Sequence, residues 1–200
     1  MNQAKQNILS RLKRNKTHKA GSAALNLEGF ISDTPARQQQ ELIEKLTENH
    51  IEVHRVDEES WPSTLCTIAR NKGVSHWLLG QGLGYQDEAQ QALLKNDDNV
   101  SITRYDQAYE TLRTTLFHDI DASLSLAQAA IAETGTLVLI PDQNEPRMLS
   151  LAPPLHVIKL YTKDIYPSLS KLIAAPPWSQ DQYMPSNILF ISSPSKTADI

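Results

Sequence analysis

Three short, strongly apolar segments in the second half of the chain restrict its fold most. They read GTLVLI over 135–140, HVIKLY over 156–161 and NILFIS over 187–192, and each is bounded by Gly, Pro or Ser. Uninterrupted apolar runs of this length are typical of strands that are buried on both faces of a sheet. We therefore expect three central strands that helices cover on either side.

The preceding part of the chain alternates between helix-like and strand-like patterns, which is the arrangement of an α/β sheet. Thr34 and Pro35 make a strong helix start, because a hydroxyl can cap the first turn and Pro fits it. The predicted order is then helix 36–50, strand 51–56, helix 61–72, strand 76–80, helix 88–95 and strand 100–105. In such α/β folds, ligands bind at the carboxyl ends of the strands.

The N-terminal 30 residues differ from the rest of the chain. Residues 2–16 are polar and basic, with Ile8 and Leu12 four positions apart, which predicts a short amphipathic helical arm. A loop rich in Gly, Ser and Asn follows it. We therefore divide the 200 residues into an arm over 1–30 and one α/β domain over 31–200, which is long enough for a single core.

Charge and hydropathy exclude two classes of partner. The formal net charge is −4, which argues against the basic surface that nucleic-acid binding needs. No apolar stretch approaches the roughly 20 residues of a membrane helix, and the N-terminus has no apolar core of the signal-peptide kind. We expect a cytoplasmic protein without membrane insertion.

The chain offers few metal ligands. Cys66 is its one cysteine, so the chain by itself can build neither a disulfide nor a cysteine-based zinc or iron–sulfur site. His50 and His54 straddle a predicted break between helix and strand. His118 with the neighbouring Asp119 and Asp121 would suit a hard metal or acid–base chemistry, but a surface role is favoured. We predict no metal site.

Two polar loops could bind an anion. Gly80, Gly82 and Gly84 follow a predicted strand, but Tyr85 stands where a dinucleotide-binding loop needs its third glycine, so a tight turn is favoured over a phosphate turn. Near the C-terminus, Ser195, Lys196 and Thr197 could cradle an anion through hydroxyl, amide and ammonium groups. An exposed loop is again the favoured interpretation of that segment, because the glycines of a P-loop are missing.

The most unusual stretch places Glu133, Thr134, Gly135 and Thr136 directly before an apolar run. A carboxylate beside a buried strand is costly unless it is hydrogen-bonded or takes part in chemistry. Glu133 could therefore be a general base, a nucleophile or a structural acceptor that ties neighbouring loops together. The residues alone leave these three roles open.

Three motifs in a fixed order resemble the lactate-utilisation (LUD) domain family, in particular its lactate utilisation protein C branch. They are AETGT at 132–136, RMLSLAPPLH at 147–156 and SPSKTADI at 193–200. The resemblance implies an open, mostly parallel α/β sheet with flanking helices, like that of sugar-phosphate isomerases and CoA transferases. Ser193 stands where the family has Gly, and relatives continue beyond the last motif, so we expect the C-terminal end of the domain to be truncated.

The resemblance also implies a role in oxidising L-lactate to pyruvate, together with partner proteins that carry iron–sulfur clusters. The chain itself would bind no cofactor. Glu133 becomes the candidate catalytic residue, and a small carboxylate or phosphorylated ligand would contact the other motif residues, which are Thr134, Gly135, Thr136, Arg147, Ser150, His156, Ser195, Lys196 and Thr197. If the three loops converge, Arg147 and Lys196 would supply the cationic contacts and Glu133 would face the same cleft.

Three functions remain open at this point. The first is a subunit or accessory protein of an iron–sulfur L-lactate-oxidising system. The second is a free-standing enzyme of the isomerase or CoA-transferase type, and the third is a module that binds a small organic acid without chemistry. We rank them in that order. The oligomeric state is open, a homo-oligomer included.

Overall fold

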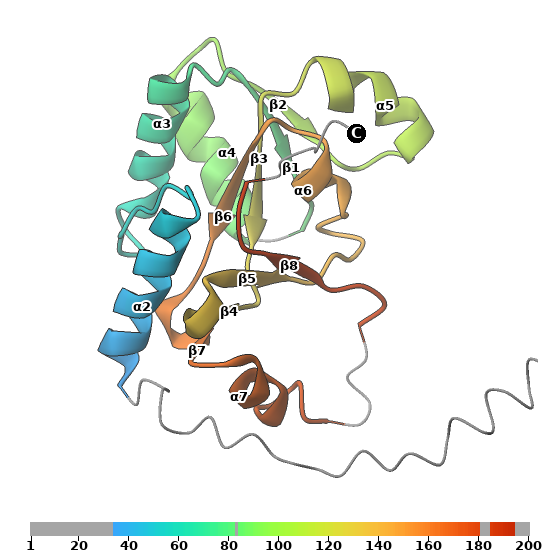
Figure 1. Ribbon diagram of the computed structural model, residues 1–200. Helices are drawn as coiled ribbons and strands as arrows, with labels where there is room; N and C mark the ends of the chain where they lie inside the picture. Colours follow the sequence, from blue (N-terminus) through green and yellow to red (C-terminus); the bar gives the residue numbers. More distant parts are fainter. Residues whose placement is uncertain (1–33, 83, 181–184, 195–200) are drawn as a thin grey trace, which may run out of the picture. The chain divides into compact units, whose positions relative to one another are not determined.

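Four parallel strands form the first of two sheets in the computed structural model, which describes residues 34–82, 84–180 and 185–194 (Figure 1). The strand order is β2-β1-β3-β6, with bounds Ser101–Arg104, His76–Leu79, Ala122–Leu126 and Leu155–Lys159. Trp77 pairs with Ala122, and Leu126 pairs with Lys159. Because all four strands run in one direction, their carboxyl ends share one edge of the sheet.

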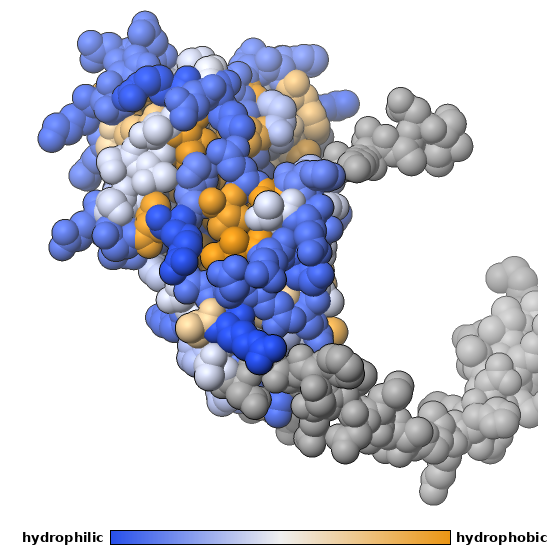
Figure 2. Space-filling model, turned by 60° about the vertical axis from the view of Figure 1, so that its left-hand side comes forward, coloured by the Kyte–Doolittle hydropathy of each residue, from blue (hydrophilic) through white to orange (hydrophobic). Residues whose placement is uncertain are grey.

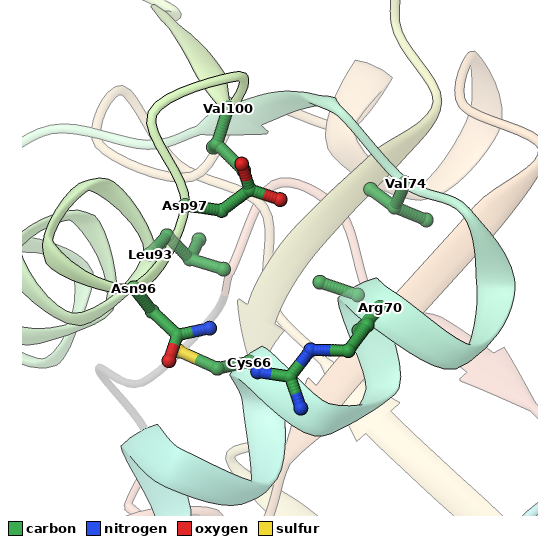
Figure 3. Close-up of a pocket in the computed structure, with 8 residues that line it drawn as sticks. Cys66, Arg70, Val74, Leu93, Asn96, Asp97 and Val100 are labelled. Carbon is green, nitrogen blue, oxygen red and sulfur yellow. The ribbon is translucent and has the colours of Figure 1, made fainter.

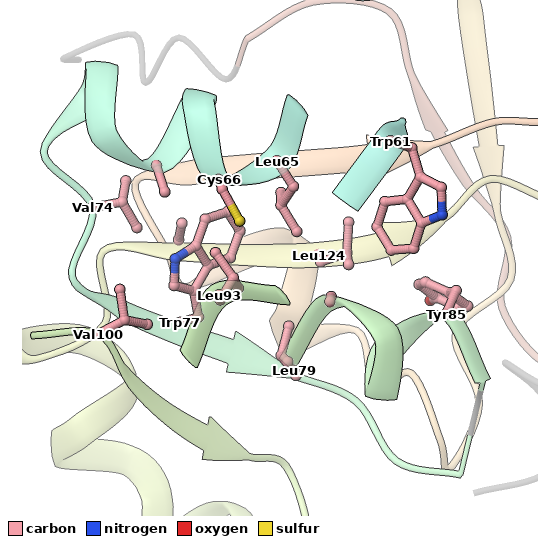
Figure 4. Close-up of a cluster of buried hydrophobic side chains, with 13 residues drawn as sticks. Trp61, Leu65, Cys66, Val74, Trp77, Leu79, Tyr85, Leu93, Val100 and Leu124 are labelled. Carbon is pink, nitrogen blue, oxygen red and sulfur yellow. The ribbon is translucent and has the colours of Figure 1, made fainter. Parts of the chain in front are cut away.

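Helices cover both faces of this parallel sheet. Trp77, Leu79 and Leu124 belong to the core on one face, which Figure 4 shows, whereas Leu78 and Leu149 belong to the core on the other. Successive residues of β1 therefore point to opposite faces, as a strand requires. The helices on the first face are α3 (Trp61–Lys72) and α4 (Gly84–Asn96), and those on the second are α5 (Tyr109–His118) and α6 (Met148–Leu151).

The second sheet is mixed. Its order is β7-β4-β5-β8, with bounds Ile165–Tyr166, Ala129–Ile131, Thr136–Leu139 and Leu189–Ile191. β5 pairs antiparallel with both β4 and β8, while β4 and β7 are parallel. A single 3₁₀ turn, η3 (Ala132–Thr134), joins β4 to β5. A second 3₁₀ turn, η4 (Thr162–Asp164), precedes β7.

One helix packs on each face of the second sheet. α2 (Pro35–Glu48) buries Leu42 and Leu46 against Leu137 and Leu139, and the short α7 (Leu169–Ala174) packs on the opposite face. As predicted, Pro35 opens α2, and the Thr34 hydroxyl accepts a hydrogen bond from the first turn. Figure 2 shows the side of the molecule on which α2 and α3 lie. Hydrophobic side chains gather in the middle of this side, and hydrophilic side chains surround them.

The α/β class and the alternation of elements are confirmed, with three differences. Residues 51–56 form no strand. Ile51 and Val53 pack on the core of the second sheet, so the alternating pattern arises because an irregular segment half-buries these two alternate side chains, although it pairs with no strand. β6 and β8 lie at sheet edges and are only partly buried, so two of the three expected central strands are peripheral. The parallel core is also confined to the first sheet.

The predicted arm over 1–30 lies outside the described residues, so the division into arm and domain stays a prediction. In the part of the chain that the structure describes, no helix is long and apolar enough to cross a membrane.

Candidate functional site

Glu133 is hydrogen-bonded to the start of a helix in this fold. It lies in η3, its backbone N–H donates to the carbonyl of Pro167 at 3.2 Å, and its Oε1 accepts from the backbone N–H of Leu169 at 3.3 Å. Leu169 is the first residue of α7, whose N-cap is Ser168. A carboxylate at this place satisfies a free N–H of the helix start. Of the three roles left open by the sequence, the geometry supports the joining of loops.

Gly135 is required by a close approach to α2. It follows η3 with φ +63°, in the left-handed region that favours glycine. A Cβ atom added there would lie 2.6 Å from the Cβ of Lys45. The glycine of the AETGT motif therefore lets the β4–β5 turn pack directly on the helix.

A chain of hydroxyls runs from the AETGT motif to the residue before the SPSKTADI motif. Thr134 and Thr136 are hydrogen-bonded through their Oγ1 atoms at 2.7 Å, and Thr136 Oγ1 is 2.9 Å from Ser192 Oγ. Ser192 directly precedes the SPSKTADI motif, so the start of that motif lies beside AETGT. Ser195, Lys196 and Thr197 are outside the described residues.

Arg147 lies at the other end of β5. It is exposed and precedes α6, and it lines an open groove of about 580 Å³ together with Ile140, Pro141, Asp142, Gln143, Pro146, Pro185, Ser186 and Asn187. The segment 140–147 follows the last residue of β5, whereas Glu133 precedes the first. The structure therefore does not bring Arg147 and Glu133 to one cleft. Ser150 is half-buried within α6.

His156 lies on β6, an edge strand of the parallel sheet. It is half-buried in β6, and its Nε2 is 3.0 Å from the hydroxyl of Ser125 on the neighbouring strand β3. Burial lowers the pKa of this imidazole from 6.5 to about 4. The ring is thus neutral at physiological pH, and its one described hydrogen-bond partner is part of the sheet.

The glycine-rich segment forms a tight turn at the carboxyl end of β1. Gly80 packs on segment 142–145: a Cβ atom there would lie 2.3 Å from the carbonyl oxygen of Asn144, and the N–H of Gln81 donates to that oxygen at 2.9 Å. Arg104 ties the turn to α4, because its guanidinium donates to the Gly80 carbonyl and to Asp87, each at 2.7 Å. Gly82 has φ +66°, and Gly84 begins α4.

A buried carboxyl group, Glu145, lies at this same edge. Its Oε1 accepts hydrogen bonds from the Tyr85 hydroxyl, from Gln86 Nε2 at 3.2 Å and from the backbone N–H of Leu126 at 3.1 Å. Glu145 is 9% exposed, and burial raises its pKa above the ordinary value of 4.5. Burial also raises the pKa of Tyr85, so the phenol remains a donor.

The two oxygens of Glu145 are not equivalent. Oε1 takes all three hydrogen bonds, while no described residue donates to Oε2. A buried carboxyl group with one oxygen held by three hydrogen bonds and with a raised pKa is suited to carry a proton. It lies where α/β sheets bind ligands, at the carboxyl ends of β1 and β3.

Sequence reasoning did not single out Glu145, Tyr85 or Gln86. The one local signal was Tyr85, which interrupts the glycine spacing and which the structure shows to be the buried phenol. The partner of this tyrosine lies 60 residues further along the chain. No spacing rule could have joined the two.

The remaining polar candidates have structural roles. Burial opposes ionisation of Asp121, but the backbone N–H groups of Ser75 and His76 hold the pKa of its carboxyl below the ordinary value. Within residues 34–82, 84–180 and 185–194, no three His, Cys, Asp or Glu side chains are grouped to hold a metal ion. His118 is exposed.

Cys66 lies beside a small cavity between α3 and α4 (Figure 3). The cavity has a volume of about 20 Å³, enough for a single water molecule, and Arg70, Asn96 and Asp97 lie at its rim with apolar residues. Burial raises the pKa of the thiol, which makes it less reactive. We therefore regard this cavity as a packing gap.

Comparison with known proteins gave three findings. Residues 39–200 match the model of the LUD domain. An uncharacterised protein of Neisseria meningitidis serogroup B is 35% identical over 149 residues, which are 74% of this chain and 63% of that relative, so the chain spans under two thirds of its length.

The third finding concerns a solved structure. The crystal structure of a DUF162 family protein from Deinococcus radiodurans superimposes with a TM-score of 0.61 at 18% identity, over 80% of this chain and 88% of that one. At this identity, the likeness supports the fold.

Proposed function

This chain belongs to the LUD domain family, and from that premise we propose that it is a subunit or accessory protein of an iron–sulfur system that oxidises L-lactate to pyruvate. The observation that carries the proposal is the family match over 39–200, which includes all three ordered motifs. The lactate utilisation protein C branch is the finer assignment that these motifs favour.

In this proposal the redox chemistry belongs to the partner proteins. Cys66 is buried and single, and one thiolate cannot ligate an iron–sulfur cluster. The chain would contribute a folded α/β domain to the assembly, in the cytoplasm. The AETGT motif would be structural, because Glu133 joins the β4–β5 turn to α7 and Gly135 seats the turn on α2.

An anaerobic pull-down tests the proposal. The full-length tagged chain is recovered from cells grown on L-lactate, and the eluate is assayed for iron and for lactate-dependent dye reduction. We expect iron-containing partners and an activity that the isolated chain lacks. Recovery of the chain alone, without iron or activity, would contradict the assignment.

A second candidate function is favoured by Glu145. A buried carboxyl with a raised pKa at the carboxyl edge of the sheet is suited to acid–base chemistry. A free-standing enzyme of the isomerase or CoA-transferase type would therefore use Glu145, and not Glu133, to move a proton. Turnover by the isolated chain that disappears in Glu145→Gln but survives in Glu133→Gln would support this alternative. The third function, a module that binds an organic acid, predicts saturable binding without turnover.

A further inference from the structure

Lys159 is a half-buried cation at the carboxyl edge of the parallel sheet. It is the last residue of β6, and its side chain is 10% exposed. The ammonium group lies 4.1 Å from the centroid of the Trp61 ring and 5.0 Å from that of Tyr161. Aromatic faces stabilise a cation, but they do not replace the anion that a buried ammonium group needs.

The anion beside Lys159 comes from the surface. Glu58 Oε1 lies 2.8 Å from Lys159 Nζ, yet the Glu58 side chain is 62% exposed. Glu58 belongs to the irregular segment between α2 and α3, where the Asp57 carboxylate accepts from the backbone N–H of Ser60 at 2.7 Å. The cation is therefore held by the core, while its carboxylate partner reaches it from a surface turn.

A second donor, on the ring beside Lys159, has no hydrogen-bond partner among the described residues. The indole Nε1 of Trp61 is buried and is not hydrogen-bonded by any described residue. It belongs to the ring that Lys159 covers, and Figure 4 shows it on the side of the ring away from Leu65. The Tyr161 hydroxyl, which donates to Glu58 at 3.5 Å, is a third donor. Lys159 and Tyr161 thus both contact the one surface carboxylate, and the ring of Trp61 lies under the ammonium group.

We infer that Lys159, Trp61 and Tyr161 form a binding site for the carboxylate group of a small organic acid, and that Glu58 is an internal carboxylate which the ligand displaces. The ligand would take the place of the Glu58 carboxylate on Lys159, since it needs the same contacts and Glu58 can turn into solvent. A carboxylate is favoured over a phosphate because the group that now fills the position is a carboxylate and the site presents one cation.

The site adjoins the buried carboxyl group of Glu145. Lys159 pairs with Leu126 across the sheet, and the backbone N–H of Leu126 donates to Glu145. A molecule anchored on Lys159 would therefore lie at the strand end next to the one that Glu145 contacts. The choice of L-lactate or pyruvate among small carboxylates rests on the proposed function, whereas the site itself rests on the contacts of Lys159.

Calorimetric titration of the full chain at constant ionic strength tests the inference, with sodium L-lactate, pyruvate, acetate and phosphate as probes. In Glu58→Gln the internal competitor loses its charge, so we expect a Kd for L-lactate about fivefold lower than in the unmodified chain, the scale of one exposed ion pair. Glu59→Gln is the matched control: Glu59 is the exposed neighbour, and its loss changes the net charge equally without touching Lys159. It should leave the Kd unchanged.

Lys159→Met keeps the apolar stem on Trp61 and removes the ammonium group, so it should abolish binding, while Lys159→Arg should retain it. Circular dichroism checks that each variant is folded; if Lys159→Met is not, the comparison of Glu58→Gln with Glu59→Gln decides. Equal binding in all variants, or no saturable binding in Glu58→Gln, would overturn the inference. Lys159-dependent binding of phosphate alone would overturn the carboxylate class. Binding of acetate but not L-lactate would uphold the site and count against the proposed function, which the pull-down tests separately.

Discussion

Protonation of His156 should make the stability of this protein depend on pH. Its pKa is about 4 in the folded chain and 6.5 in the unfolded chain, because the sheet buries the ring. The unfolded state therefore binds the proton first as the pH falls, so stability is complete above pH 6.5 and is lost between 6.5 and about 4. The direction is a loss of stability on acidification.

The size of the loss follows from the two pKa values. Between pH 7.5 and pH 5.0, the imidazole of the unfolded chain is titrated over about 1.5 pH units below its pKa of 6.5. Each of these units lowers the free energy of unfolding by about 1.36 kcal/mol, which gives a loss of about 2 kcal/mol. For a chain of this size, such a loss lowers Tm by about 4–8 °C. Glu145 acts in the opposite direction, so the effect of His156 must be isolated by comparison with a variant.

The variant is His156→Gln, whose amide can replace the imidazole Nε2 near Ser125 Oγ without titrating. Urea unfolding at pH 7.5 and 5.0 gives the free energy of unfolding of both proteins. We expect the unmodified chain to lose about 2 kcal/mol more than the variant between the two pH values. His118→Gln, at an exposed position on α5, is the control and should show the pH dependence of the unmodified chain.

Two results would refute this reasoning. If His156→Gln and the unmodified chain lost equal stability on acidification, the ring would not be buried as a neutral group. If the NMR titration of the His156 ring protons in the folded chain gave a midpoint near 6.5, the premise itself would be wrong.

Three further predictions concern the motif and the buried carboxyl. Gly135→Ala should lower the free energy of unfolding in urea by about 2–4 kcal/mol, because of the left-handed backbone and the clash with α2. Gly73→Ala, at φ +66° with nothing within 4 Å of the added Cβ, should lower it by only about 1–2 kcal/mol. Equal losses in the two variants would contradict the close approach. Glu133→Ala should cost about 1 kcal/mol, because the backbone N–H of Leu169 at the start of α7 loses its acceptor, and Glu133→Gln should cost less. A lactate-dependent activity lost in a fully stable Glu133→Gln would contradict the structural role. The pKa of Glu145 is raised in the folded chain, so the unmodified protein should gain stability relative to Glu145→Gln as the pH falls from the raised value towards 4.5. If the difference in the free energy of unfolding between the two proteins stayed constant from about pH 8 to about pH 5, the carboxyl group would not be buried.

Local patterns determined the elements and their class. The hydroxyl and Pro at the start of α2 predicted where that helix begins, because capping depends on residues within one turn. Apolar periodicity located α3, β1 and β5, because a repeat of 3.6 or 2 residues records which face is buried. The same signal failed at 51–56, since periodicity reports burial and not whether a strand partner is present.

The tertiary structure alone decided what the polar residues do. Glu145 meets Tyr85 across 60 residues of chain, and Lys159 meets Glu58 across 101. Glu133 is chemically able to act as base, nucleophile or acceptor, and it accepts a hydrogen bond in this fold because α7 begins beside it. The role of a carboxylate depends on the hydrogen-bond donors and the dielectric around it. Segments far away in the sequence supply both, and the sequence does not show which of them lie close together in the fold.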